Sequence, residues 1–332
     1  TPDIHRVDDP QGGCRLAENA PTLPELLRDA GYRCAGFVTS DFLQGRIGFH
    51  RGFDHYELRQ FNPGERQNRL ARDWIETNRK DPLFVFLHYI DAHSDWVEMP
   101  YEAAGGFDAL FGGPDPEEPF SGCSADRVHC ASEYLTHLNR TASRLSPAQR
   151  RELRRQYDRG LRYLDYQLAR FVAGLKQLGL WESSLVILFS DHGEEFEDHG
   201  MYLHSQLYEE LLRVPLLVKL PGGRHGGTRV DVAVELVDLA PTILHLLDVP
   251  VPRTMQGREL ASLLERPGDG RSPFSWSADA GSIQEGNWKL FFQLDDGRPR
   301  PPRLCELERD PGELVDRLGQ APGGPERLGS AL

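Results

Sequence analysis

The sequence of 332 residues contains little cysteine and no long apolar run. No apolar stretch approaches the roughly 18 residues of a membrane-spanning helix, so the sequence indicates no membrane span. No signal peptide is visible, but the chain begins at Thr1 without methionine, so this absence excludes no compartment. Cys123 and Cys130 could close a loop, and the odd number of cysteines leaves the compartment open. The five cysteines form no Cys-x-x-Cys pair and no zinc-ligand spacing: Cys14, Cys34, Cys123, Cys130 and Cys305.

The sequence also has fewer basic than acidic residues. The chain has 38 Lys and Arg against 51 Asp and Glu, which gives a formal net charge of −13. An acidic surface repels phosphate backbones and anionic lipids, so the composition argues against nucleic-acid and membrane-surface binding. An anionic substrate would therefore need a metal ion, or a cluster of His and Lys, within its site.

The apolar pattern that is present predicts an α/β fold. Thr22 and Glu25 have the spacing of a helix capping box, and Ser146-Pro147 begins the strongest helical pattern, which ends at Gly179. Helices that alternate with continuous apolar strands are typical of a layered fold with a mainly parallel sheet. Helices are expected over residues 22–31, 65–80, 146–179, 206–213 and 240–247, and buried strands over residues 34–39, 83–89, 185–189 and 214–220.

Two stretches depart from this alternation. Residues 94–145 lose helical and strand periodicity and gather Gly and Pro, which predicts a long surface insertion that shapes substrate choice. Beyond about residue 255, short apolar runs separated by Gly, Pro and Asp predict a small antiparallel module. We therefore expect an α/β body over residues 1–255 and a C-terminal subdomain over residues 256–332.

Polar residues directly after buried strands are candidates for a site, because ligands of parallel sheets lie beyond the carboxyl ends of the strands. Asp191 and His192 follow the strand at 185–189 and offer an adjacent carboxylate and imidazole to one cation, while Gly193 lets the backbone approach. The alternative is a capped turn, since Asp is a common N-cap after a strand. The acidic run that follows favours the rim of a site over a solvated face: Glu194, Glu195, Glu197 and Asp198.

Two further histidines are candidates for contact with an anionic group. His93 follows the strand at 83–89, at a strand end expected to run parallel to the one holding Asp191, and otherwise reads as a hydrogen-bonded loop histidine. His204 precedes the helix expected from residue 206, and its alternative role is to flank that helix. Near a metal ion, either histidine could bind an anion or protonate a leaving oxygen.

Together these segments resemble the sulfatase family of the alkaline-phosphatase superfamily, and the resemblance covers nearly the whole length of the sequence. Phe86-Leu87-His88-Tyr89-Ile90-Asp91-Ala92-His93 is similar to the stretch that ends in the family's substrate-binding His. Ser190-Asp191-His192-Gly193-Glu194 matches the motif whose acidic residue and next neighbour coordinate a divalent cation. Further similar segments follow in the family's order: Gly48-Phe49-His50-Arg51-Gly52-Phe53-Asp54, Arg213-Val214-Pro215-Leu216, Val237-Asp238-Leu239-Ala240-Pro241-Thr242 and Leu307-Glu308-Arg309-Asp310-Pro311-Gly312-Glu313.

The resemblance implies a fold and a site. The fold is an alkaline-phosphatase-like three-layer sandwich with a mainly parallel central sheet and a small C-terminal antiparallel α+β module. Asp191 and His192 would hold Ca²⁺, with Zn²⁺ or Mn²⁺ as alternatives. His93 and His204 would contact the ester oxygens of a sulfate ester, and His204 would also help the leaving group.

The resemblance also implies a nucleophile that the sequence does not contain. In the family it is a formylglycine made from Cys or Ser in a Cys-x-Pro-Ser-Arg motif, before a segment that Pro2-Asp3-Ile4-His5-Arg6-Val7 resembles. It is expected upstream of Thr1 together with two acidic cation ligands, so we expect an N-terminally truncated hydrolase, inactive as given. The segment Cys123-Ser124-Ala125-Asp126-Arg127 lacks the Pro and Ser and is a coincidence.

The sequence leaves three functions to be separated. The leading expectation is a cation-dependent sulfuric ester hydrolase that acts on an anionic ester or a sulfated glycan. The second is a phosphoric or phosphonic ester hydrolase of the same superfamily, because Thr39-Ser40-Asp41 lacks the Lys and His that many arylsulfatases carry there. The third is a non-catalytic binding protein on the same fold. The compartment and the oligomeric state stay open, and only the resemblance favours a periplasmic or secreted location.

Overall fold

The computed structural model describes residues 15–94, 101, 107, 130–265, 271–277, 279–295 and 298–320. Its contacts divide the chain into two units, the first comprising Thr1–Ser184 with Ile243–Gln256 and the second Leu185–Thr242 with Gly257–Leu332. This division follows contacts rather than chain order, so the body and subdomain expected on either side of residue 255 stay a prediction. Cys14, Cys123 and the side chain of Cys130 lie outside the described residues, while Cys34 and Cys305 are buried free thiols.

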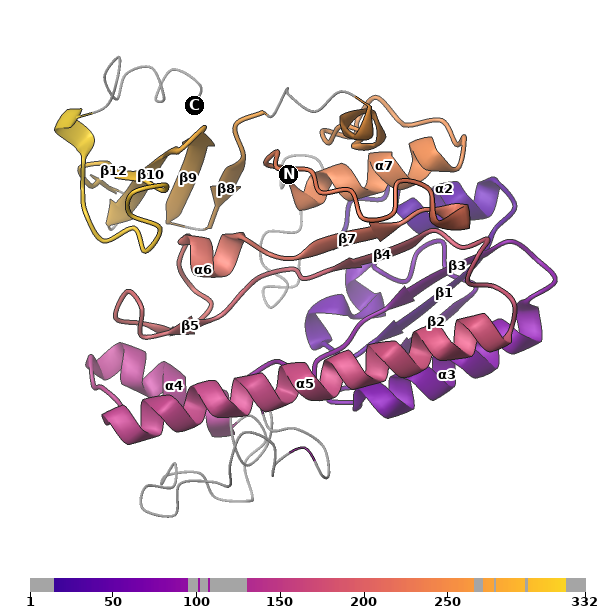
Figure 1. Cartoon of the computed structure of the whole chain (residues 1–332), viewed down its shortest axis with the longest axis horizontal. Coiled ribbons are helices and arrows are strands. Elements are labelled where there is room, and N and C mark those ends of the chain that lie inside the picture. Colours follow the sequence, from indigo (N-terminus) through magenta and orange to yellow (C-terminus); the bar gives the residue numbers. More distant parts are fainter. Residues whose placement is uncertain are drawn as a thin grey trace. The chain divides into compact units, whose positions relative to one another are not determined.

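The first unit contains a parallel sheet of three strands in the order β2-β1-β3 (Figure 1). The central strand β1 (Arg33–Val38) pairs in parallel with β2 (His55–Leu58) and with β3 (Leu83–Leu87). Residues 34–39 are all buried, as their unbroken apolar pattern predicts for a strand covered on both faces. The parallel sheet expected from the sequence is confirmed here.

Helices pack on this sheet through apolar stripes. Helix α2 (Leu23–Asp29) begins at the predicted capping box, in which Thr22 accepts the Glu25 N–H and the Glu25 carboxylate accepts the Thr22 N–H. Helix α3 (Gly64–Asn78) packs against β1, β3 and α5 (Pro147–Gln177). Two clusters form the core, one around Ala35, Phe37 and Ala71 and one around Leu27, Cys34 and Leu244.

The cap of α5 is also as predicted, and it supports a stability test. Ser146 Oγ accepts the Gln149 N–H at 3.2 Å, and Gln149 Oε1 accepts the Ser146 N–H at 3.0 Å. Ser146→Ala leaves one of these N–H groups without its acceptor, so we expect it to lower the free energy of unfolding by about 1 kcal/mol in a urea titration. The control is Thr77→Ala, which removes an exposed hydroxyl from the last turn of α3 and should change the free energy of unfolding by less. Equal losses in the two variants would contradict the role of the cap.

One helix was missed within the range expected to be irregular. Helix α4 (Cys130–Thr141) lies inside residues 94–145 and buries Leu135 and Leu138. The pair is three residues apart, as a helix requires, but a stretch of twelve residues holds too few repeats to stand out beside the Gly- and Pro-rich segment before it.

The second unit begins with strands that pair antiparallel. Strand β4 (Val186–Phe189) pairs with β7 (Leu216–Lys219), and β5 (Glu195–Phe196) pairs with β6 (Tyr202–Leu203). The prediction that 185–189 is fully buried was wrong, since Leu188 is 39% and Phe189 37% exposed. Among the described residues β4 has one hydrogen-bonded neighbour, β7, so it forms a two-stranded sheet rather than the interior of a larger one. Helices α6 (Glu209–Leu212) and α7 (Leu239–Leu246) follow.

The C-terminal part of the second unit is an antiparallel sheet, as the sequence predicts. Strand β10 (Trp288–Asp295) is central and pairs with β9 (Ala280–Glu285), β11 (Arg298–Pro299) and β12 (Arg303–Glu306), and β9 also pairs with β8 (Phe274–Trp276). Ile283, Leu290 and Leu304 form its core. Within the described ranges, no helix has the length and apolar character needed to cross a membrane. Short 3₁₀ helices occupy Asp41–Leu43, Gly45–Ile47, Pro221–Gly223, Leu236–Asp238, Ala261–Leu264 and Leu318–Gln320.

Candidate active site

The turn after β4 presents Asp191 and His192 as the sequence predicts. The Asp191 carboxylate is 70% exposed, and its Oδ1 lies 3.9 Å from His192 Nε2 and accepts the His192 N–H at 3.1 Å. Gly193 holds the turn against α6, because a Cβ built on it would come within 1.8 Å of the Glu210 carbonyl oxygen. The glycine is therefore required by the close approach of two backbone segments.

The hydrogen bond made by His192 determines which ring nitrogen can act as a ligand. His192 Nδ1 lies 2.8 Å from the Gly193 carbonyl oxygen. A carbonyl only accepts, so the assigned tautomer has the proton on Nδ1 and the lone pair on Nε2. This arrangement, with one ring N–H held by a backbone carbonyl, is the usual one for metal-binding histidines.

Asp191 and His192 together fit a divalent cation. Ligand atoms lie about 2.0–2.6 Å from such ions, so two donors 3.9 Å apart can share one. A carboxylate suits Ca²⁺, Mg²⁺ and Mn²⁺, whereas an imidazole nitrogen suits Zn²⁺ better. The pair offers one donor of each kind.

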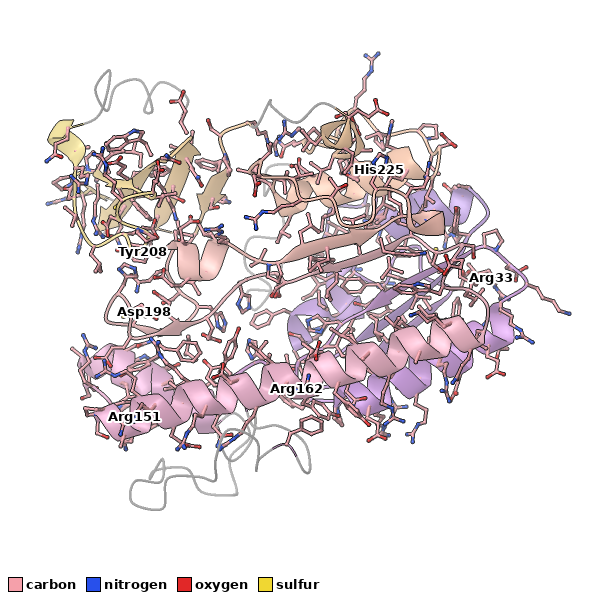
Figure 2. The ribbon with its side chains drawn as sticks, viewed as in Figure 1. Arg33, Arg151, Arg162, Asp198, Tyr208 and His225 are labelled. Atoms are coloured by element: carbon pink, nitrogen blue, oxygen red, sulfur yellow. The ribbon has the colours of Figure 1, made fainter. Side chains whose placement is uncertain are left out.

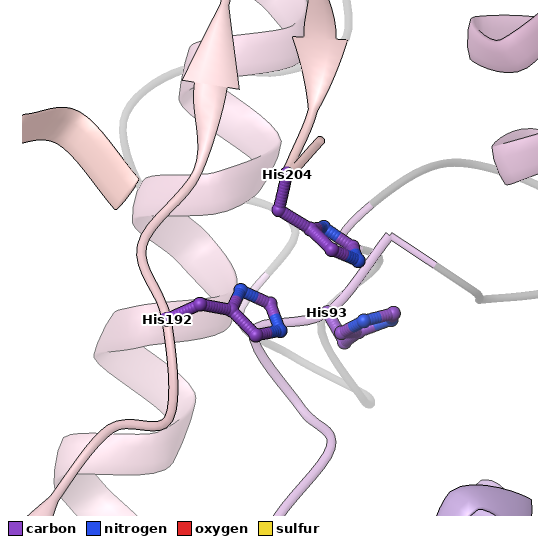
Figure 3. Close-up of side chains that lie close together, drawn as sticks. All are labelled: His93, His192 and His204. Carbon is purple, nitrogen blue, oxygen red and sulfur yellow. The ribbon is translucent and has the colours of Figure 1, made fainter. Parts of the chain in front are cut away.

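His204 lies in the same unit and reaches the same place from a different segment. It follows β6, and its imidazole stacks on that of His192 with ring centroids 4.1 Å apart and an interplanar angle of 22° (Figure 3). His204 Nδ1 lies 3.5 Å from Oε1 of Glu194. The structure thus brings three of the predicted residues together: Asp191, His192 and His204.

His93, the fourth predicted residue, belongs to the first unit. It is half-buried, and its backbone N–H donates to the Ile90 carbonyl at 2.9 Å in the turn that follows β3. Asp91 in the same turn is structural, because its buried carboxylate accepts the Gly64 N–H at 2.9 Å and so caps α3. Burial raises the pKa of Asp91 to about 6.

The acidic run after Gly193 is partly buried, so it is not simply a solvated face. Glu194 is 8% exposed and Glu195 fully buried, whereas Asp198 is exposed (Figure 2). Glu195 Oε1 accepts a hydrogen bond from Gln206 Nε2 at 2.9 Å, and Glu197 Oε2 accepts one from the Tyr202 hydroxyl at 2.7 Å. The hairpin β5–β6 therefore folds part of the acidic run inward.

The burial of Glu195 predicts a pH dependence of stability. Burial first, and then the charge of Glu210, raises the pKa of Glu195 from 4.5 to about 8. A carboxyl group whose pKa is raised by folding binds its proton more tightly in the folded state, so its contribution is present in full below pH 4.5 and is lost as pH rises through about 8. We expect Glu195→Gln, which keeps the acceptor for Gln206, to flatten the fall in unfolding free energy over this range. Urea titrations at several pH values test this, and a slope equal to that of the wild type would contradict it.

A second group of metal-ligand side chains was missed by the sequence analysis. Atoms of His199, Glu210 and Glu313 lie within 4.8 Å of one another. The buried ammonium of Lys289 already contacts this group, at 2.9 Å from Glu313 Oε1 and 2.8 Å from Glu209 Oε1. Lys289 thus pairs with Glu313 of the group and with the neighbouring Glu209, while His199 Nε2 lies 3.5 Å from Glu210 Oε1, so these side chains form an ion-pair network of the second unit. The segment that ends in Glu313 resembles a family motif, but spacing along the chain could not connect it with His199 and Glu210.

An aromatic residue completes this network. The rings of Tyr208 and His199 stack with centroids 3.4 Å apart, and the Tyr208 hydroxyl accepts a hydrogen bond from Arg303 at 2.9 Å (Figure 2). Burial lowers the pKa of His199, and this effect outweighs the charge of Glu210, which raises it. These contacts hold α6, and with it the Gly193 turn, against β10 and β12 of the same unit.

Comparison with known proteins identifies the family of the chain. The family model described as Sulfatase matches residues 9–249. The multifunctional alkaline phosphatase superfamily protein PehA of Trinickia caryophylli is 28% identical over 288 residues, which cover 75% of this chain and 54% of PehA. Arylsulfatase K of Gallus gallus is 29% identical over 205 residues, which cover 57% of this chain and 38% of that protein.

A solved structure extends the likeness to the fold. A protein in complex with its substrate D-glucosamine-2-N,6-O-disulfate superposes with a TM-score of 0.76 at 17% identity, and the match covers 99% of this chain and 83% of that one. This likeness shows the expected fold, an alkaline-phosphatase-like α/β architecture with a parallel sheet and a C-terminal antiparallel sheet. The chain spans about half, or less, of the length of the two curated relatives. Because the family model matches well over half of its residues, the chain belongs to the Sulfatase family.

Proposed function

We propose that the protein hydrolyses sulfate esters, with a divalent cation held by Asp191 and His192. The observation that supports this best is the pairing of the exposed Asp191 carboxylate with a His192 ring whose Nδ1 is engaged by a carbonyl. An acidic chain needs such a cation to accept an anionic ester. The substrate is an anionic ester small molecule or a sulfated glycan, in keeping with the disulfated sugar bound by the structural relative.

The residues of the proposed site have separate roles. The cation, when bound, supplies Lewis-acid stabilisation of the charge on the ester group. Asp191 and His192 hold it, and His204 binds an ester oxygen and donates a proton to the leaving oxygen. His93 is proposed to bind the ester from the turn after β3. The packing of His204 on His192 supports a shared role for these two rings.

A second candidate is a phosphoric or phosphonic ester hydrolase that uses Zn²⁺ or Mn²⁺. The observation that favours it is the imidazole donor of His192, because a nitrogen ligand suits Zn²⁺ better than Ca²⁺. The likeness to PehA, whose name places it in the alkaline phosphatase superfamily, also supports it.

Metal analysis and paired assays distinguish the candidates. The full-length protein is purified, its metal content is measured, and hydrolysis of an aryl sulfate and an aryl phosphate diester is compared under the same conditions. Bound calcium with a preference for the sulfate supports the proposal, whereas zinc or manganese with a preference for the phosphate supports the second candidate. Turnover of neither ester, in a protein that still binds them, would favour a non-catalytic binding protein.

A further inference from the structure

The register of the β5–β6 hairpin places Glu194 opposite His204. Glu195 pairs with Leu203 and Phe196 pairs with Tyr202, so the next positions outward along the two strands are Glu194 and His204. Side chains that face each other across an antiparallel pair are close enough to interact directly. The two residues are ten positions apart in sequence, and the hairpin alone brings them together.

The carboxylate of Glu194 is directed at the His204 ring. Its side chain is 4% exposed, and its Oε1 lies 3.5 Å from His204 Nδ1. Oε1 is buried and accepts no hydrogen bond in the described structure. Leaving a buried carboxylate oxygen without a hydrogen-bond donor costs free energy, and a ring N–H of His204 at this position supplies a donor to Glu194 Oε1.

The other acidic groups of the same segment have different partners. Gln206 donates to Glu195, the Tyr202 hydroxyl donates to Glu197, and the Phe196 N–H donates to Asp198 at 3.0 Å. His199, the other nearby histidine, faces Glu210 at 3.5 Å. Glu194 is paired with His204, whose Nδ1 lies 3.5 Å from its Oε1.

The backbone that presents His204 adopts a conformation that is rare for its residue type. Leu203 has a φ of 72°, in the left-handed region that bulky side chains avoid. Such strain persists where the surrounding structure enforces it, and it gathers at functional sites. The hairpin thus holds the residue before His204 in a costly conformation that fixes the direction in which the histidine leaves the strand.

We infer that Glu194 is a positioning residue for His204. Its carboxylate accepts the Nδ1 proton of His204 and fixes the ring, so that Nε2 faces the ester and carries the proton that goes to the leaving oxygen. The inference rests on the proposed function for its catalytic consequence, but not for the orientation of the ring. No proton moves between Glu194 and His204, because Nδ1 keeps its proton throughout.

Nitrogen-15 NMR of histidine-labelled protein tests the orientation without turnover. The shifts of the two ring nitrogens report which of them bears the proton, and His204→Gln identifies the signals. At mildly alkaline pH we expect His204 to carry its proton on Nδ1 in the wild type and to lose this preference in Glu194→Gln. The control is Glu197→Gln, which alters an acid of the same hairpin that contacts Tyr202, and it should leave the His204 signals unchanged. A wild-type proton on Nε2 would overturn the inference, whether or not any variant folds.

Kinetics of the full-length protein test the consequence. Loss of the partner that orients a catalytic histidine should lower kcat for esters with poor, alkyl leaving groups by roughly 10- to 100-fold. KM, and kcat for an activated aryl ester, should change little, because a good leaving group needs no proton. An equal loss for both kinds of ester would overturn the positioning role. If the protein hydrolyses no ester, the proposed function fails while the NMR result still decides the orientation.

Discussion

In the full-length protein, replacing His204 by glutamine should lower kcat for sulfate esters with alkyl leaving groups by roughly 10²- to 10⁴-fold, the range associated with a lost general acid. The reason is the position of the ring, which stacks on His192 at 4.1 Å and is thereby held beside the proposed cation ligands. Esters of acidic phenols should lose much less, because their leaving oxygen departs without a proton. Steady-state kinetics over a series of leaving groups tests this difference between the two kinds of ester. In His204→Gln, kcat should depend more steeply on the pKa of the leaving group than it does in the wild type.

A surface histidine of the same unit serves as the control for this variant. His225 is exposed and has a φ of 56°, a conformation that asparagine tolerates, so His225→Asn should leave both kcat and the leaving-group dependence unchanged (Figure 2). If His204→Gln raises KM while kcat and the leaving-group dependence stay the same, His204 binds the substrate but does not donate the proton.

Replacing Asp191 by alanine should remove the bound cation and lower kcat by roughly 10³-fold, since Lewis-acid stabilisation is worth several kcal/mol and each 1.4 kcal/mol is tenfold in rate. Asp191 Oδ1 lies 3.9 Å from His192 Nε2, and without this carboxylate the His192 imidazole is a weak site for a hard cation. Elemental analysis of the dialysed protein measures the loss as a drop in metal per chain.

The metal measurement has its own control in an exposed acid of the second unit. Asp231 pairs with Arg229 at the surface, so Asp231→Ala should retain the wild-type metal content and activity. Full metal content in Asp191→Ala would show that the cation is held elsewhere and would remove the basis of the proposed function.

Much of the fold follows from local pattern. The capping boxes at Thr22 and Ser146 and the apolar stripe of α5 need only near neighbours in sequence, and the structure places α2 and α5 where they predict. The strand 34–39 was predictable for the same reason, since its unbroken apolar run requires cover on both faces. Helix α4 and the exposure of β4 were not, because a short helix gives few repeats and an apolar strand does not reveal how many neighbours it has.

The candidate site was predicted in part. Asp191 and His192 are adjacent in sequence and follow a strand, so a turn alone places them together. The burial of Glu195 could not be predicted, because composition shows that a segment is charged but not which carboxylate loses its water. Lys289 and Glu313 lie 80 and 104 residues from their partners on α6, and no spacing rule spans such distances.

The sequence by itself determined the family, the alternation of helices and strands, and the residues able to bind a cation or donate a proton. The tertiary structure alone decided which of these residues meet. Hairpin register set Glu194 against His204, and close backbone approach at Gly193 fixed the turn that carries Asp191. The physical reason is that chemistry is a property of each side chain, whereas distance and desolvation arise only when segments remote in sequence pack together.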